Sequence, residues 1–133
     1  MDIMVKTALI NAFVVGSGGF LGTLARFGLN GLVQRQLPTA AFPYGTLVVN
    51  LLGCFLIGSV VGLAEERQLL GQETRAVVLI GVLGGFTTFS AFGYETFEML
   101  RDGNYARATC NAGIHVALGV AFVWLGHTLT TSR

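Results

Sequence analysis

The sequence predicts an all-α integral membrane protein with four transmembrane helices. Its 133 residues are 53% hydrophobic and only 11% charged, and their mean hydropathy is +0.68. Soluble domains carry roughly 25% charged residues, so a soluble fold is excluded. Four apolar segments reach the roughly 20 residues that a helix needs to cross the hydrocarbon core. The connections between these segments are short, which leaves no room for a soluble domain.

We expect one domain over residues 1–133, with four spans in order. They cover about 7–33, 45–64, 76–99 and 107–130. Two prolines in residues 38–43 predict the turn between the first two spans. Gly103 is the expected glycine cap before the fourth span. The first apolar stretch is too long for the core of a cleavable signal, roughly 7–15 residues, so we treat it as a membrane helix.

Glycine pairs four residues apart recur in three spans. They are Gly18 with Gly22, Gly58 with Gly62, and Gly81 with Gly85. Such pairs let helices approach closely in lipid, and we interpret most of them as packing positions.

The third span is interrupted near its centre by residues 84–92, with the sequence GGFTTFSAF. Adjacent glycines, adjacent threonines and a serine loosen the helical backbone or compete for its hydrogen bonds. Irregular backbone at membrane depth persists only where protein buries it or where it lines a cavity or an ion site. The stretch therefore predicts a break in the third helix, and this break is the first candidate site.

Basic residues divide evenly between the two sides of the membrane. One side holds Lys6, Arg67, Arg75 and Arg133, and the other holds Arg26, Arg35, Arg101 and Arg107. The positive-inside rule therefore gives no preferred orientation. One explanation is that some of these residues lie too deep to count. The other is dual topology, in which the chain inserts both ways and forms an antiparallel homodimer.

Polar side chains in the first two spans are further candidates. Arg26 lies in an apolar stretch, where a charge either serves a function or snorkels to the interface. Thr46 and Asn50 are four residues apart and share one helix face. The Asn50 amide carries two N–H donors, which either join two helices or donate to an anion.

The third span adds aromatic rings to its broken backbone. Phe89 and Phe92 share a face, where phenylalanines usually pack, although their electropositive ring edges can also face an anion. Ser90 contributes a hydroxyl, and Glu95 either reaches the interface or borders a pathway. Carbonyls freed by the break are ligands of the kind that coordinate cations.

The fourth span carries Asn111 and His115, four residues apart on an otherwise apolar helix. They form a polar stripe that either hydrogen-bonds between helices or lines a pathway.

Several functions are excluded by composition. A formal net charge of +1 gives no electrostatic footprint for nucleic acid. Cys54 and Cys110 lack ligand-like spacing and are interpreted as packing residues. We find no nucleophile–base pair, metal cluster or phosphate loop, so we do not expect an enzyme. The first, second and fourth spans lack the embedded carboxylate typical of proton-coupled pumps, and the remaining donors favour an anion as the moving species.

Three motifs resemble the small bacterial fluoride channels of the Fluc or CrcB family. They are GFLGTLARF at 19–27, GTLVVN at 45–50 and GGFTTFSAF at 84–92. The resemblance covers nearly the whole chain. It implies a multi-pass protein of the bacterial cytoplasmic membrane that passively exports fluoride through two pores of a dual-topology, antiparallel homodimer.

By motif position, the resemblance also implies roles for individual residues. Phe89 and Phe92 match the family's pore-lining phenylalanines, and Asn50 matches its pore asparagine, with Thr46 beside it. The backbone carbonyls of Gly84 and Thr87 match the ligands of a structural sodium ion at the dimer centre.

The remaining correspondences are looser. Ser90 falls in the polar track, whereas Ala91 stands where family members often carry threonine or serine. Arg26 and Glu95 correspond to residues at the pore entrances. Asn111 and His115 belong to a fourth-helix stripe that varies within the family.

Two other functions remain open at this stage. A dual-topology small multidrug transporter, coupled to protons, would need an embedded carboxylate in the first helix, and none is present there. A non-conducting assembly protein would use the same glycines and polar residues only to pack helices.

Overall fold

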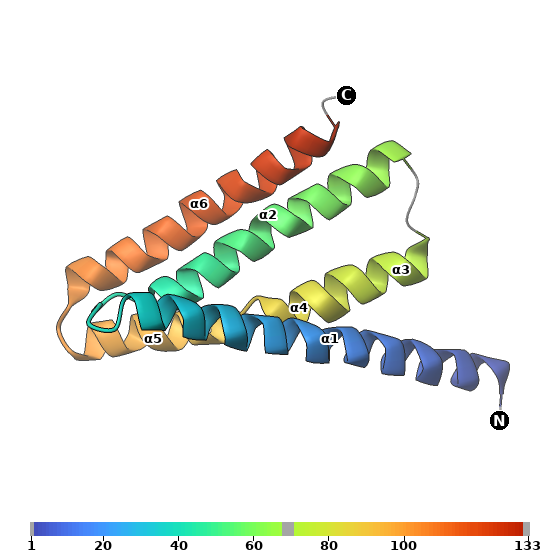
Figure 1. The fold of residues 1–133 in the computed structure, drawn as a ribbon, viewed down its shortest axis with the longest axis horizontal. Coiled ribbons are helices and arrows are strands. Elements are labelled where there is room, and N and C mark those ends of the chain that lie inside the picture. The colour runs from blue at the N-terminus through green and yellow to red at the C-terminus, as the bar shows by residue number, and fades with distance from the viewer. Residues whose placement is uncertain (1, 68–70, 132–133) are drawn as a thin grey trace.

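The computed structural model describes residues 2–67 and 71–131, and over these residues it is all-helical (Figure 1). In chain order the elements are α1 (Ile3–Gln36), α2 (Tyr44–Arg67), α3 (Gln72–Ala76), the π-helix η1 (Val77–Leu83), α4 (Gly84–Phe86), α5 (Phe89–Arg101) and α6 (Tyr105–Thr131). Four helical segments are long and apolar enough to cross a membrane: Ile3–Gln36, Tyr44–Glu65, Glu73–Arg101 and Tyr105–Thr131. The predicted four-span fold class is confirmed, with α3 to α5 together forming the third span.

The helix ends follow local turn chemistry. α1 ends at Gln36, two residues before Pro38, and the Pro43 carbonyl accepts the first helical hydrogen bond of α2 from the Leu47 N–H at 3.1 Å. Gly103 has a φ of 74°, and the Asn104 N–H beyond it donates to the Met99 carbonyl at 2.8 Å. The expected glycine cap before the fourth span is therefore confirmed.

The helices extend beyond the apolar segments that predicted them. α1 runs over Ile3–Gln36, whereas the sequence analysis expected about 7–33. α2 continues to Arg67, so the polar connection to α3 is shorter than expected. The reason is that helical hydrogen bonds continue past the apolar core into the interfacial layer, where polar side chains are tolerated.

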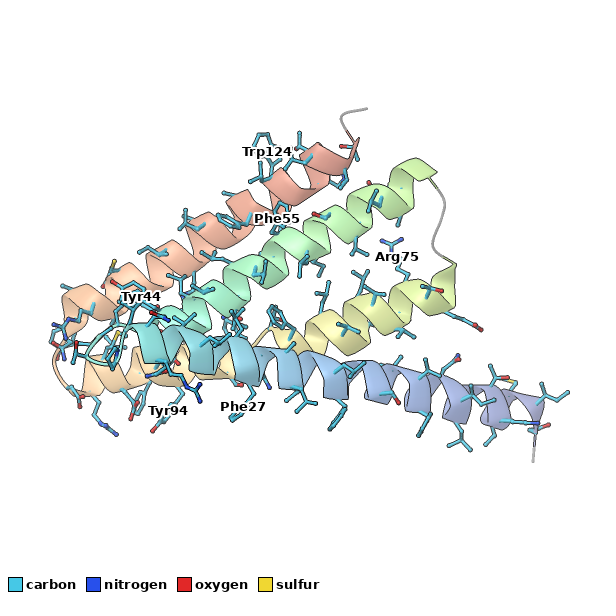
Figure 2. The ribbon with its side chains drawn as sticks, viewed as in Figure 1. Phe27, Tyr44, Phe55, Arg75, Tyr94 and Trp124 are labelled. Atoms are coloured by element: carbon cyan, nitrogen blue, oxygen red, sulfur yellow. The ribbon has the colours of Figure 1, made fainter. Side chains whose placement is uncertain are left out.

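The four spans pack as two close pairs. α2 lies along α6, and α1 lies along η1 and α4 (Figure 1). The start of α1, the start of α3 and the last turns of α2 and α6 are at one end of the bundle, and the α1–α2 and α5–α6 turns are at the other (Figure 1). Large apolar side chains such as Phe27 on α1 and Trp124 on α6 are 80% and 67% exposed and point away from the bundle (Figure 2). These outward faces suit lipid contact.

Glycines bring the paired helices into backbone contact. A Cβ atom at Gly58 would collide with the Val123 carbonyl of α6, and one at Gly126 would collide with the Phe55 carbonyl of α2. In the other pair, a Cβ atom at Gly22 would collide with the Val82 carbonyl of η1. The predicted packing role of the small residues is confirmed, because in lipid such close van der Waals contact is what holds helices together.

We predict that Gly126→Ala destabilises the α2–α6 pair. The added methyl group meets backbone that cannot move aside as a flexible side chain would, and overpacking of this kind costs about 1–3 kcal/mol. Gly113→Ala on the same helix is the matched control, since no neighbouring atom lies within 4 Å of the added group. Thermal unfolding in detergent measures the stability of both variants. Equal stability of the two would contradict the close α2–α6 seam.

Candidate functional site

The break in the third span lies at Thr87 and Thr88, between α4 and α5. Both residues are extended, with ψ of 158° at Thr87 and φ of −149° at Thr88. The predicted break is confirmed, but Gly84 and Gly85 remain helical in α4. The glycines instead permit close packing, because a Cβ atom at Gly85 would collide with the Gly19 carbonyl of α1. The two β-branched threonines are the residues that leave the helix.

The Asn50 side chain on α2 replaces backbone hydrogen bonds that the break removes. Its Nδ2 donates to the Thr88 carbonyl at 3.1 Å, and its Oδ1 accepts from the Thr88 N–H at 2.9 Å. Sequence analysis left two roles open for Asn50, a helix-joining bond and a donor to an anion. The structure uses its Oδ1 and one of its N–H groups to hold the broken backbone, and the second N–H is left for another acceptor.

Carbonyls at the break lose their helical donors, and those of Gly84 and Thr87 are among them. The Thr88 N–H donates to Asn50, so it does not reach the Gly84 carbonyl four residues earlier. The Thr88 hydroxyl caps α5 by accepting from the Ala91 N–H at 3.2 Å, which takes the helical donor away from the Thr87 carbonyl. These freed carbonyls belong to the two residues that the sequence analysis proposed as cation ligands.

Arg26 and Thr23 reach the break from α1. The Arg26 Nη1 lies 3.4 Å from the Thr87 carbonyl oxygen, and the Thr23 hydroxyl lies 3.4 Å from the Gly85 carbonyl oxygen. Arg26 therefore points inward, to the broken backbone, and is half-buried. The sequence analysis did not select Thr23, because a single hydroxyl in an apolar helix carries no distinctive pattern.

A hollow of about 360 Å³ opens between α2, the third span and α6, and we call it the central hollow. Residues that contribute to it include Asn50, Gly84, Thr87, Phe89, Phe92 and His115. Three of its rings form a row: the centroids of Phe89 and Phe92 are 5.5 Å apart, and those of Phe92 and His115 are 4.4 Å apart. Phe89 is 83% exposed, so the row is open on its Phe89 side within a single chain.

A second hollow, also of about 360 Å³, collects the other predicted residues. It is bordered by Arg26, Thr46, Ser90 and Glu95, and Thr88 borders both hollows. Thr46 is only 4% exposed and donates to the Glu95 carboxylate at 2.5 Å, which joins α2 to α5. The Ser90 hydroxyl lies 3.2 Å from that of Thr88. The sequence analysis assigned Thr46 and Ser90 to the pore with the phenylalanines, and Arg26 and Glu95 to its entrances. In the fold all four border a hollow that is separate from the ring row.

The predicted stripe on α6 is also divided. Asn111 is fully buried, and its Nδ2 donates to the Thr96 hydroxyl of α5 at 2.9 Å. Thr96 in turn donates to the Phe92 carbonyl at 2.7 Å. Asn111 thus joins two helices, while His115 lines the central hollow. The sequence analysis did not identify Thr96, whose position in the third span gave no sign of its partner on α6.

Fold and site together define a multi-pass membrane protein whose third span is broken and whose polar groups converge on that break. The family described as CrcB-like protein, Camphor Resistance (CrcB), matches residues 13–127. The chain belongs to this family.

Curated relatives agree with this assignment. The fluoride-specific ion channel FluC of Nitratidesulfovibrio vulgaris is 45% identical over 113 residues, which cover 85% of this chain and 90% of the relative. The protein of the same name from Nitrosococcus oceani is 47% identical over 116 residues, which cover 87% and 92%. That from Geobacter sulfurreducens is 47% identical over 108 residues, which cover 81% and 86%.

We predict that Asn50→Leu exposes the broken backbone to exchange. The substitution preserves approximate size but removes both bonds to Thr88, and each unmet buried partner costs about 1–3 kcal/mol. Amide hydrogen exchange in lipid nanodiscs should show rapid exchange at Thr88 in the variant and protection in the unsubstituted chain. Thr23→Val, which removes only the 3.4 Å contact to Gly85, is the control and should leave Thr88 protected. Equal protection in all three proteins would show that Asn50 does not hold the break.

Proposed function

We propose that this protein is a passive fluoride channel. Family membership and the names of its relatives support fluoride as the ion. The observation that carries the proposal is the row of rings at the break, where Phe89, Phe92 and His115 line the same hollow as Asn50. No acidic side chain contributes to the central hollow as the structure describes it, so no carboxylate charge there repels an anion.

The chemistry of the central hollow suits a small anion that must be released again. Fluoride gives up bound water only to closely placed donors, and a conducting site must replace that water without holding the ion tightly. Aromatic ring edges are weakly electropositive, so Phe89 and Phe92 attract an anion without forming strong hydrogen bonds. The Asn50 N–H adds one directional donor. This combination would attract an anion weakly enough for conduction.

The conducting unit in this proposal is an antiparallel homodimer with two pores. A single chain leaves Gly84, with its freed carbonyl, and Ser90 exposed, and exposed polar groups at the break are unfavourable in lipid. A second copy related by a two-fold axis in the membrane plane would cover these groups with the same surface. The even division of basic residues supports insertion in both orientations.

A structural sodium ion at the dimer centre extends the proposal. The carbonyls of Gly84 and Thr87 have lost their helical donors, and carbonyl oxygens are ligands that hard cations accept. Two copies would supply four such oxygens. The positive charge of the ion would balance their dipoles. The Arg26 guanidinium already lies 3.4 Å from the Thr87 oxygen, so the ion would have to approach this oxygen from another direction.

One observation favours a proton-coupled transporter as the second candidate. Glu95 is a half-buried carboxylate in the third span, bonded to Thr46. A proton-coupled exporter carries such a group where its substrate binds. Glu95 borders the second hollow, whereas the rings line the central one.

Fluoride efflux from loaded liposomes tests the channel. We expect passive efflux from the unsubstituted protein and a loss of at least about tenfold in Phe89→Ile or Phe92→Ile, because an aliphatic chain has no electropositive edge. Phe97→Ile on the same helix is the control, since Phe97 is 57% exposed and lies outside both hollows. Drug-driven proton exchange without fluoride efflux would favour the transporter, and undiminished efflux in both ring variants would remove the rings from the pathway.

Dual topology has a separate test. A protease-cleavable tag placed after residue 133 should be cut from either face of the membrane in about half of the molecules, as an antiparallel pair requires. Adding charge with Thr39→Arg and Ala40→Arg, in the α1–α2 turn, should bias the tag to one face by the positive-inside rule. A tag that is always on the same face in the unsubstituted chain would contradict the antiparallel dimer.

A further inference from the structure

The proton on neutral His115 is assigned by its hydrogen bond. The Nδ1 atom lies 3.0 Å from the Asn111 carbonyl oxygen, one helical turn earlier on α6. A carbonyl oxygen only accepts, so Nδ1 must be the donor and carry hydrogen. In the neutral ring the other nitrogen, Nε2, then carries no hydrogen and presents a lone pair.

This Nε2 atom is buried and has no hydrogen-bond partner among the described residues. The ring that carries it lies against Phe92, with centroids 4.4 Å apart, at the wall of the central hollow. A buried polar atom without a partner is uncommon in a native protein and points to a group that the isolated chain does not supply. Because the ring packs on Phe92 and borders the central hollow, the ring row is the nearest place from which such a group could reach it.

We propose that His115 is a proton-dependent anion ligand of the central hollow, with Nε2–H as a donor beside Phe92 when the ring is protonated. The inference rests on the proposed function, because the anion is the fluoride that the ring row would pass. In the neutral ring the Nε2 lone pair repels an anion. In the protonated ring Nδ1 keeps its bond to Asn111, and Nε2 acquires a hydrogen that points away from that bond.

The surroundings leave this positive charge without a fixed counter-ion. Of the other residues that border the central hollow, Cys54 on α2 is the one with an ionisable side chain. On α5, the Glu95 carboxylate accepts from Thr46 and borders the second hollow, and the Glu98 carboxylate accepts from the Tyr94 hydroxyl at 2.9 Å. Arg26 on α1 lies at the Thr87 carbonyl. An entering anion is therefore the natural partner of protonated His115.

The proposal makes anion occupancy and proton binding reciprocal. If fluoride binds the protonated ring more tightly, then fluoride must favour ring protonation by the same factor. The fraction of rings that carry a proton rises as the pH falls, so fluoride flux should increase between pH 8 and pH 5.5.

The decisive experiment observes His115 as the sole histidine of a variant. The chain has only two histidines, and His127 lies outside both hollows, bonded to Glu65 at 3.0 Å. The variant His127→Gln leaves His115 as the sole imidazole. Its ring nitrogens, labelled with ¹⁵N and observed by NMR in nanodiscs, report both tautomer and protonation.

We expect the neutral ring to carry hydrogen on Nδ1. When sodium fluoride replaces sodium chloride, the pH of half-protonation should rise by about 0.5 units or more, which corresponds to about a threefold preference of fluoride for the protonated ring. The same titration curve in both salts, or a neutral ring with hydrogen on Nε2, would overturn the proposal.

Liposome flux separates this inference from the channel itself. His115→Gln keeps a polar side chain but does not titrate, so its fluoride efflux should lose the increase at acidic pH that the His127→Gln control retains. Efflux that responds equally to pH in both variants would remove His115 from the pathway and leave the channel intact. A fluoride-dependent titration shift in a protein that conducts no fluoride would keep the anion site and reject the channel.

Discussion

The reciprocal pair of hydrogen bonds between Asn50 and Thr88 is the interaction on which the rest of the site depends. Irregular backbone inside a membrane needs partners, because no water is present to supply them. Asn50 supplies a donor and an acceptor at once, at 3.1 and 2.9 Å. By taking the Thr88 N–H, it also frees the Gly84 carbonyl. The cap that the Thr88 hydroxyl makes for α5 frees the Thr87 carbonyl in the same way.

Glycine packing positions this break relative to the other helices. The close approach of Gly22 to Val82 and of Gly85 to Gly19 presses η1 and α4 against α1. As a result, Thr23 and Arg26 on α1 reach carbonyls that would otherwise lack partners. The same glycines that hold the spans together therefore also complete the hydrogen bonding of the break. Packing and chemistry depend on one set of close backbone contacts.

The two hollows that meet at the break differ in chemistry. The central hollow holds the ring row and His115, and the second hollow holds Arg26 and the Thr46–Glu95 pair. If the rings form the proposed anion pathway, the Glu95 carboxylate lies in the other cavity, away from the ion. A protonatable imidazole at the end of the row would then make the local charge of that pathway depend on pH.

The sequence by itself determined the four spans, the broken third helix, the glycine pairs and the glycine cap at Gly103, because apolar length, turn chemistry and helix-breaking residues are local properties. It also identified the family through three motifs. The tertiary structure decided what each polar residue contacts. Asn111 and His115 lie one turn apart, yet one joins α6 to Thr96 and the other lines the central hollow. Which side chain reaches the broken backbone depends on the rotation and crossing of the helices, and spacing along one helix does not contain that information.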